Sequence, residues 1–243
     1  MDAPAEALAT PAPPRAPWRG RDLLFTGIGA IVLSILVVVP LGFLTFGRGG
    51  GFSFAHVGAI GIAVYAALWA STWYFTLNRR GARLADAGFR PVAGTTLLKM
   101  IPVTLGLMGL NAIMVAISAR FFGDVPTAQD QVVGGATSIT LVEFMWLFAL
   151  GAIAAPIVEE FVFRGVLYRL FRNRLSVGAA VIASAVAFAL LHLIVPLIPA
   201  LLVMGIVLAA LAQRYDSLYP AIVVHALNNA AALVALYAAI GRG

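Results

Sequence analysis

Six polar side chains in the C-terminal half of the chain stand inside otherwise apolar sequence. They are Glu159, Glu160, Arg164, His192, His225 and Asn229. Carboxylates and imidazoles can take a proton from water and so activate it as a nucleophile, and imidazole and amide N–H groups can stabilise an oxyanion. An ionisable group at the centre of a membrane helix costs roughly 2.5–3.5 kcal/mol. These side chains are therefore expected to pair with one another or to face a water-filled cavity.

The spacing of the first three residues predicts how they share these tasks. Glu160 and Arg164 are four residues apart, so they lie on one helix face and can form an ion pair. Glu159 points about 100° away from Glu160 around the helix. We therefore expect Glu160 to be held by the arginine and Glu159 to be the carboxylate that remains for chemistry. The alternative is that all three form a structural polar clamp between helices.

The two histidines are expected to meet this carboxylate. If a helical turn centres near Leu175, Glu159 and His192 lie about equally far from it, at similar depth on antiparallel neighbours. His225 and Asn229 share one face of the last helix because they are four residues apart. His225 is near the start of its helix, whereas this count places Glu159 and His192 deeper. We nevertheless expect the three elements to converge on one site.

The convergent groups fit the hydrolysis of a peptide bond. Glu159 would be the general base, helped by His192, and His225 and Asn229 would donate hydrogen bonds to the oxyanion of a peptide carbonyl. Glu159, His192 and His225 could instead hold a zinc ion, so a zinc cofactor is left open. The chain has no His-Glu-x-x-His pair, no Gly-x-Ser-x-Gly elbow and no cysteine.

The composition predicts that membrane helices position these residues. Of the 243 residues, 62% are hydrophobic and 11% are charged, whereas soluble domains are near half apolar and a quarter charged. This excludes a soluble enzyme, a disordered chain and a fibrous repeat. The net charge is +6, but the arginines lie between apolar runs, which indicates membrane topology and not nucleic-acid binding. The absence of cysteine excludes disulfides and thiolate chemistry.

The predicted fold is all-α, a polytopic transmembrane helical bundle of about seven spans, with six to eight compatible with the pattern. The expected helices are 23–45, 55–77, 98–118, 139–172, two helices within 175–213, and 219–240. Pro196 and Pro199 mark the turn between the paired helices. Residues 1–20 are rich in proline and alanine and are predicted to be a disordered cytoplasmic tail. Residues 21–243 are predicted to form one membrane domain with a catalytic core at about 139–240.

The basic residues predict the orientation of the bundle. They gather in the tail, in the 78–99 connection, in 164–174 and at 214, and seven spans place all four groups on one side. Basic loops face the cytoplasm. We expect a cytoplasmic N-terminus and an external C-terminus.

Three motifs carry a resemblance to a known family. The sequence Glu159-Glu160-Phe-Val-Phe-Arg164, then Phe188-x-x-x-His192, then His225-Ala-x-x-Asn229 resembles the CPBP family, the CAAX protease and bacteriocin-processing (Abi) intramembrane endopeptidases. The similarity extends over about 145–232.

The resemblance implies a CAAX-protease-like core with a cavity open to the cytoplasm, in the bacterial cytoplasmic membrane. It implies that Glu159 acts with His192 on water, that His225 and Asn229 form the oxyanion site, and that Glu160 and Arg164 support them. Family members have been described both as metalloproteases and as glutamate proteases, so both mechanisms stay open. The expected partners are a peptide or protein substrate, entering from the membrane or the cytoplasmic side, and the lipid bilayer, with no nucleic acid.

Two other functions are compatible with the same residues. A non-catalytic immunity or assembly factor could retain the polar cluster for structure or for peptide binding. A small transporter could use the buried carboxylates to carry protons, although no internal repeat supports this.

Overall fold

The protein is described here by a computed structural model, which covers residues 16–46, 54–123, 125 and 139–240. The helices of the N-terminal half are α1 (Gly20–Phe46), α2 (Phe54–Thr72) with the π turn η1 (Trp73–Leu77) and the 3-10 turn η2 (Asn78–Arg80), η3 (Leu84–Ala87), α3 (Gly94–Leu98) and α4 (Met100–Phe122). Those of the C-terminal half are α6 (Leu141–Phe148), η4 (Ala149–Ala154), α7 (Ala155–Glu160), η5 (Phe161–Tyr168), α8 (Arg169–Arg172), α9 (Val177–Leu191), η6 (Val195–Leu197), α10 (Ile198–Tyr215) and α11 (Tyr219–Ile240).

Within the described ranges, six helical segments are long and apolar enough to cross a membrane, and α9 is a shorter seventh apolar helix. The predicted all-α polytopic bundle is therefore confirmed. The segments α6, η4, α7, η5 and α8 follow one another without a break, as the prediction of one long helix over 139–172 requires. The break between α9 and α10 contains Pro196, and Pro199 lies in the first turn of α10.

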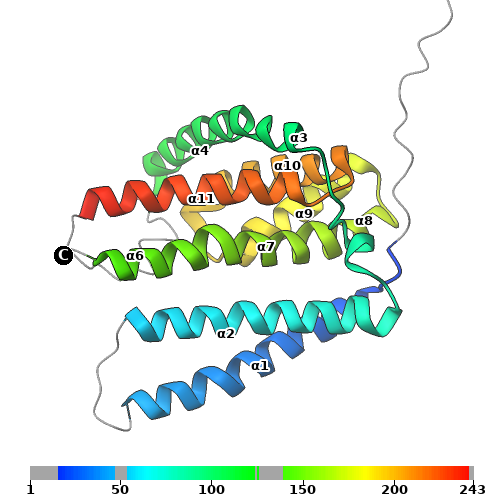
Figure 1. Cartoon of the computed structure of the whole chain (residues 1–243). Coiled ribbons are helices and arrows are strands. Elements are labelled where there is room, and N and C mark those ends of the chain that lie inside the picture. Colours follow the sequence, from blue (N-terminus) through cyan, green and yellow to red (C-terminus); the bar gives the residue numbers. More distant parts are fainter. Residues whose placement is uncertain (1–15, 47–53, 124, 126–138, 241–243) are drawn as a thin grey trace, which may run out of the picture.

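The helices run approximately along one direction, with α1 and α2 as a pair beside the rest of the bundle (Figure 1). The long segment from α6 to α8 packs between this pair and the last helix, α11. Helices α9 and α10 form a tight hairpin, in which a Cβ atom on Gly205 would lie 2.8 Å from the Cα of Ala185. Because of this close approach, the C-terminal cap of α9, His192, lies near the segment from α6 to α8.

The last residues of the predicted tail contact the bundle. Residues 1–15 lie outside the described residues, but Ala16 and Trp18 are buried against the bundle. The Trp18 indole Nε1–H donates to the carbonyl oxygen of Val166 at 2.9 Å, and Ala16 exchanges two hydrogen bonds of 3.0 Å with Asn173. Burial of Trp18 is favourable because its large aromatic ring leaves water while its N–H keeps a hydrogen-bond partner. The disordered tail itself stays a prediction.

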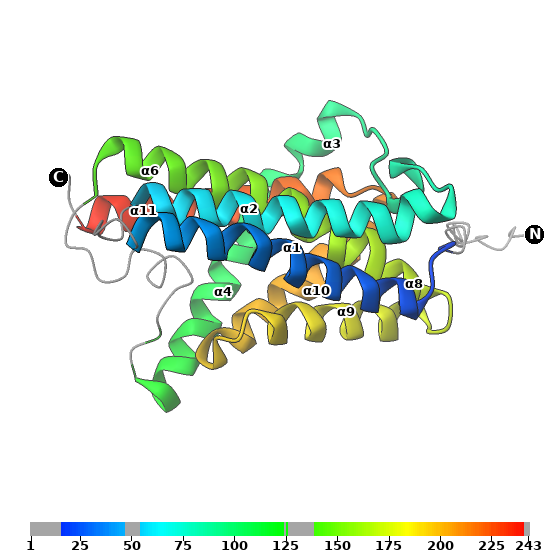
Figure 2. The same ribbon diagram turned by 90° about the horizontal axis from the view of Figure 1, so that it is seen from below.

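Helix α1 begins and α8 lies at one end of the bundle (Figure 2). We call it the basic end because Arg21 lies in the first turn of α1 and both ends of α8 are arginines, Arg169 and Arg172. Arg80 forms a bidentate ion pair with Asp22, in which Nε lies 2.9 Å from Oδ2 and Nη2 lies 2.7 Å from Oδ1. Arg90 and Arg169 both pair with Asp216. These contacts fix α1, the 84–90 connection and the α10–α11 turn at this end, while α11 runs to the opposite end (Figure 1).

Candidate active site

The two glutamates lie on α7, a helix of six residues between two π segments. In η4 the amide of Ala155 donates to Leu150, five residues back, as in a π-helix. Pro156 follows, and it has no N–H to donate to a carbonyl of the preceding turn. This missing donor explains the irregular backbone hydrogen bonding of the segment. π segments inside α-helices are frequent at functional sites.

The Glu160–Arg164 ion pair forms as the spacing predicts. Arg164 Nη1 lies 2.8 Å from Glu160 Oε1, and both side chains are fully buried. Arg164 Nη2 donates to the carbonyl oxygen of Gly205 at 3.1 Å, and its guanidinium lies 4.5 Å from the Phe188 ring centroid. The arginine thus connects the long segment to both helices of the α9–α10 hairpin.

His225, buried on α11, lies next to both carboxylates. Its Nδ1 is 2.9 Å from Glu160 Oε1 and its Nε2 is 3.7 Å from Glu159 Oε2. A carboxylate oxygen only accepts hydrogen bonds, so Nδ1 carries a proton and donates to Glu160. In the neutral imidazole, Nε2 then presents a lone pair to the space beside Glu159.

His192 reaches the same space from the end of α9. The helix stops at Leu191, and His192 is its C-terminal cap. Its Nδ1 lies 2.7 Å from the carbonyl oxygen of Phe188, so Nδ1–H is the donor, and its Nε2 lies 3.9 Å from Glu159 Oε2. Leu193 follows in the left-handed region, with φ +57°, and is 85% exposed. The strained turn ends the helix at the residue that carries the imidazole.

The two carboxylate oxygens of Glu159 have different surroundings. Oε1 accepts a hydrogen bond from the hydroxyl of Tyr65 at 3.1 Å. Oε2 is buried and has no hydrogen-bond partner among the described residues. It faces the Nε2 atoms of His192 and His225 across gaps of 3.9 Å and 3.7 Å, longer than a direct hydrogen bond. Polar contacts longer than 3.5 Å of this kind are places to look for a water molecule that contacts both groups.

Asn229 stands apart from this cluster. Its Nδ2 donates to the carbonyl oxygen of Gly151 at 3.0 Å, and its Oδ1 lies 3.5 Å from Nδ2 of Asn228. These are its hydrogen bonds in the described part of the chain. An amide nitrogen has two N–H groups, so one remains for another acceptor. The structure thus brings Glu159, Glu160, Arg164, His192 and His225 into one cluster of linked pairs. It places Asn229 one helical turn beyond His225.

The open zinc hypothesis can be tested against this geometry. Zinc binds nitrogen and oxygen at about 2.0–2.1 Å in a tetrahedron, which places neighbouring ligand atoms roughly 3.3 Å apart. The separations from Glu159 Oε2 to the two Nε2 atoms are 3.9 Å and 3.7 Å. Over the described ranges, no group of three histidine, aspartate or glutamate side chains has an arrangement that could hold a metal ion. The residues as arranged do not fit a zinc site.

Tyr65 was missed by the sequence analysis. It lies on α2, far from the three motifs, and a single tyrosine in an apolar helix is a weak signal. Tyrosines in membrane helices are enriched near the interfaces, whereas Tyr65 lies within the span Gly58–Arg80. Its position away from the span ends was the available sign that its hydroxyl has an internal partner.

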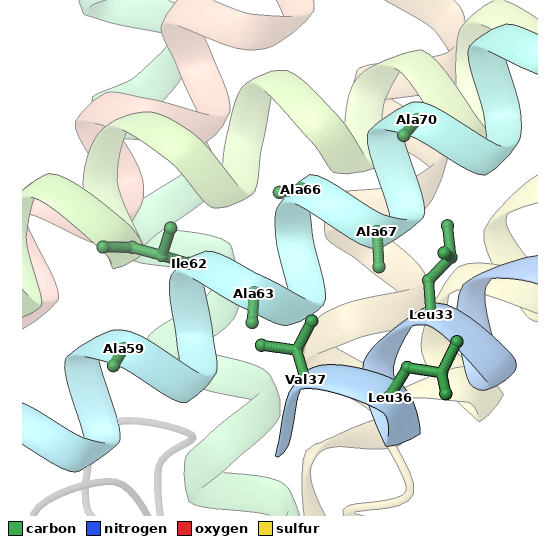
Figure 3. A pocket seen from close by; sticks show the side chains of 9 residues that line it. All are labelled: Leu33, Leu36, Val37, Ala59, Ile62, Ala63, Ala66, Ala67 and Ala70. Carbon is green, nitrogen blue, oxygen red and sulfur yellow. The ribbon is translucent and has the colours of Figure 1, made fainter. Parts of the chain in front are cut away.

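An open apolar groove of about 560 Å³ lies between α1 and α2 (Figure 3). Its walls are formed by Leu33, Leu36, Val37, Ala59, Ile62, Ala63, Ala66, Ala67 and Ala70. None of the polar residues described above lines it. The groove is therefore separate from the cluster around Glu159 and forms part of the apolar surface of the α1–α2 pair.

The membrane-crossing helices and the buried carboxylate–imidazole cluster define the class, an integral membrane protein with ionisable groups inside its bundle. Residues 141–231 match the family of Rce1-like proteins, described as type II CAAX prenyl endopeptidase Rce1-like. The matched segment runs from α6 into α11 and contains all six residues of the motifs, so the resemblance to CAAX proteases is confirmed. Comparison with curated proteins and with solved structures gave no significant match.

Proposed function

We propose that the protein is an intramembrane endopeptidase of the CAAX prenyl protease type, in which Glu159 and His192 activate a water molecule. The observation that carries this proposal is the buried, unpartnered Oε2 of Glu159, which faces Nε2 of His192 and of His225. These three atoms face one space, and a water molecule placed there can donate its two protons to Glu159 Oε2 and to one of the imidazole nitrogens. The match to the CAAX endopeptidase family supports the choice of a peptide bond as the substrate.

The proposed hydrolysis needs only side chains of this chain and one water molecule. The water oxygen attacks the carbonyl carbon of the scissile bond while its proton passes to Glu159 Oε2. The carbonyl oxygen becomes an oxyanion, to which the second N–H of Asn229 donates. His225 also donates to it from Nε2 once the ring has taken up a second proton from solvent, because its Nδ1–H is already given to Glu160. Collapse of the tetrahedral intermediate breaks the C–N bond, and the proton held on Glu159 Oε2 passes to the leaving amine.

Glu160 and Arg164 have a supporting role in this proposal. Glu160 Oε1 receives hydrogen bonds from both Arg164 and His225, at 2.8 Å and 2.9 Å. This shared contact fixes the His225 ring and the tautomer that directs Nε2 toward Glu159. Orienting groups of this kind determine which imidazole nitrogen reacts.

We further propose that the basic end of the bundle is cytoplasmic, with the N-terminus inside and the C-terminus outside a bacterial cytoplasmic membrane. The ion pairs of Arg80, Arg90 and Arg169 all lie at this end. His225 is close to the start of α11 at the same end, which favours a site that opens to the cytoplasm. Fusions of green fluorescent protein and of alkaline phosphatase to the C-terminus test the orientation, since only the phosphatase fusion should be active.

The direct test of the activity uses the purified full chain in lipid vesicles. The probe is a fluorogenic peptide with a farnesylated cysteine followed by three residues. The wild type should release the three-residue tail, and Glu159→Ala should not, although it inserts and folds. If neither protein cleaves the probe, the membrane peptides of wild-type and Glu159→Ala cells are compared by mass spectrometry. Identical peptide sets, with no cleavage of the probe, would overturn the proposal and favour a non-catalytic factor.

A further inference from the structure

The hydrogen bond from Tyr65 to Glu159 joins the site to a helix outside the segment that matches the family. Tyr65 lies on α2, and its hydroxyl donates to Glu159 Oε1 at 3.1 Å. We propose that Tyr65 is a positioning residue, which fixes the Glu159 carboxylate so that Oε2 faces the two imidazoles. This inference rests on the proposed role of Glu159 as general base.

The need for such a residue follows from the flexibility of glutamate. The side chain has three rotatable bonds, and the carboxylate could turn either oxygen toward the imidazoles. Glu160 Oε1 is fixed by an arginine and a histidine. For Glu159, the hydroxyl of Tyr65 supplies the hydrogen bond that holds one oxygen and leaves Oε2 directed at the reaction space. A base held in one orientation spends less of its time in unproductive positions.

Contacts on either side of Tyr65 fix its own position. One turn earlier on the same face of α2, a Cβ atom on Gly61 would lie 3.0 Å from Leu150 of η4. One turn later, the Trp69 ring lies 4.8 Å from the ring of Phe161, the residue that follows Glu160. Residues 61, 65 and 69 are four apart and share a face. The face of α2 that carries Tyr65 is therefore packed directly against the segment that carries Glu159.

In this inference, α2 helps to position Glu159, a role that its apolar sequence does not indicate. The groove on α2 is lined by alanines and Ile62, and Tyr65 is not among its residues (Figure 3). The tyrosine face contacts the catalytic segment, and other residues of the same helix form the apolar surface toward α1. The activity should therefore depend on α2, although the family match begins at residue 141.

The test compares Tyr65→Phe with wild type and with Glu159→Ala in the vesicle assay. Phenylalanine keeps the ring and its packing, so only the hydroxyl is lost. We expect kcat to fall roughly tenfold or more while KM stays within about twofold, because the hydroxyl orients the base and does not bind substrate. Tyr74→Phe is the matched control, since the Tyr74 ring is 47% exposed on the same helical segment and should leave kcat unchanged.

Two further measurements separate positioning from simple stability. Replacement of Tyr65 by 3-fluorotyrosine, which keeps a hydroxyl of altered donor strength, should restore most of the kcat that Tyr65→Phe loses. The infrared carboxyl band that disappears in Glu159→Gln should also shift in Tyr65→Phe, whether or not any peptide is cleaved.

The outcomes distinguish this inference from the proposed function. If wild type cleaves, Glu159→Ala does not, and Tyr65→Phe has the wild-type kcat, the role of Tyr65 is overturned while the peptidase stands. If the infrared band is unmoved in Tyr65→Phe, the inference is overturned as well. Absence of cleavage in wild type, with identical membrane peptides in Glu159→Ala cells, would remove the proposed function itself.

Discussion

Asn229 on α11 donates a hydrogen bond of 3.0 Å to the carbonyl oxygen of Gly151 in the η4 segment. In the π register of η4, Ala155 donates to Leu150, so the next amide would donate to Gly151. That next residue is Pro156, which has no N–H. The side chain of Asn229 therefore supplies the hydrogen bond that the proline cannot, and it ties α11 to the segment just before the two glutamates.

This relationship predicts a measurable coupling between Asn229 and Pro156. Asn229→Ala should destabilise the protein by roughly 1 kcal/mol, as for other hydrogen bonds between membrane helices. The loss should be smaller in a Pro156→Ala background, because the new amide can donate in place of the asparagine. Unfolding in a denaturing detergent measures all four proteins of the cycle, and equal losses in both backgrounds would contradict the pairing.

The same cycle separates the structural role of Asn229 from its proposed role at the oxyanion. If its second N–H stabilises the oxyanion, Asn229→Ala should lower kcat about 10²–10³-fold. This loss should persist when Pro156→Ala has recovered the stability. Recovery of activity together with stability would show that Asn229 acts only through the helix.

The buried ion pair predicts a second pattern of non-additivity. Glu160→Gln or Arg164→Met alone leaves one charge uncompensated in a site of zero exposure and should cost roughly 3–5 kcal/mol. The double variant removes both charges and should cost less than the sum of the two single changes. Its thermal stability should recover in part while its activity stays low, because His225 then lacks the carboxylate that orients it. Strict additivity of the two losses would show that the pair is not coupled.

The left-handed turn after His192 gives a further prediction. Leu193 has φ +57° and is 85% exposed, so its side chain contributes little packing in return for a strained backbone. Leu193→Gly should leave stability unchanged or raise it by up to about 1 kcal/mol, because glycine adopts this conformation without strain. The matched control is Leu191→Gly, in the last turn of α9, which should destabilise. A clear loss of stability in Leu193→Gly would show that the leucine side chain has a packing role.

The separations around Glu159 lead to a prediction about metal. Because Oε2 is 3.9 Å and 3.7 Å from the two imidazole nitrogens, the cluster is wider than a zinc site. The proposed mechanism therefore expects full activity after exhaustive chelation, and less than stoichiometric zinc in the active protein by elemental analysis. Loss of activity on chelation, restored by zinc, would establish the metalloprotease alternative that the sequence left open.

Local spacing was enough to predict much of the site. Residues four apart on a helix share a face, so the ion pair of Glu160 with Arg164 and the separate direction of Glu159 followed from the sequence alone. The long uncharged runs likewise predicted the order of the helices and about seven spans, with six to eight compatible, because a bilayer requires about 20 apolar residues for each span. The order and spacing of the three motifs identified the family over the segment that the match covers.

Only the tertiary structure decided which partners meet across helices. The sequence count left His225 shallower than Glu159, yet its two ring nitrogens lie 2.9 Å from Glu160 and 3.7 Å from Glu159. The contact of Tyr65 with Glu159 spans 94 positions, and Asn229 meets a carbonyl freed by a distant proline. Helical periodicity specifies the direction of a side chain around its own axis, but contacts between helices depend on how the helices pack and where their hydrogen-bond registers change. Those relations are properties of the assembled bundle, and they determine which oxygen of Glu159 faces the reaction space.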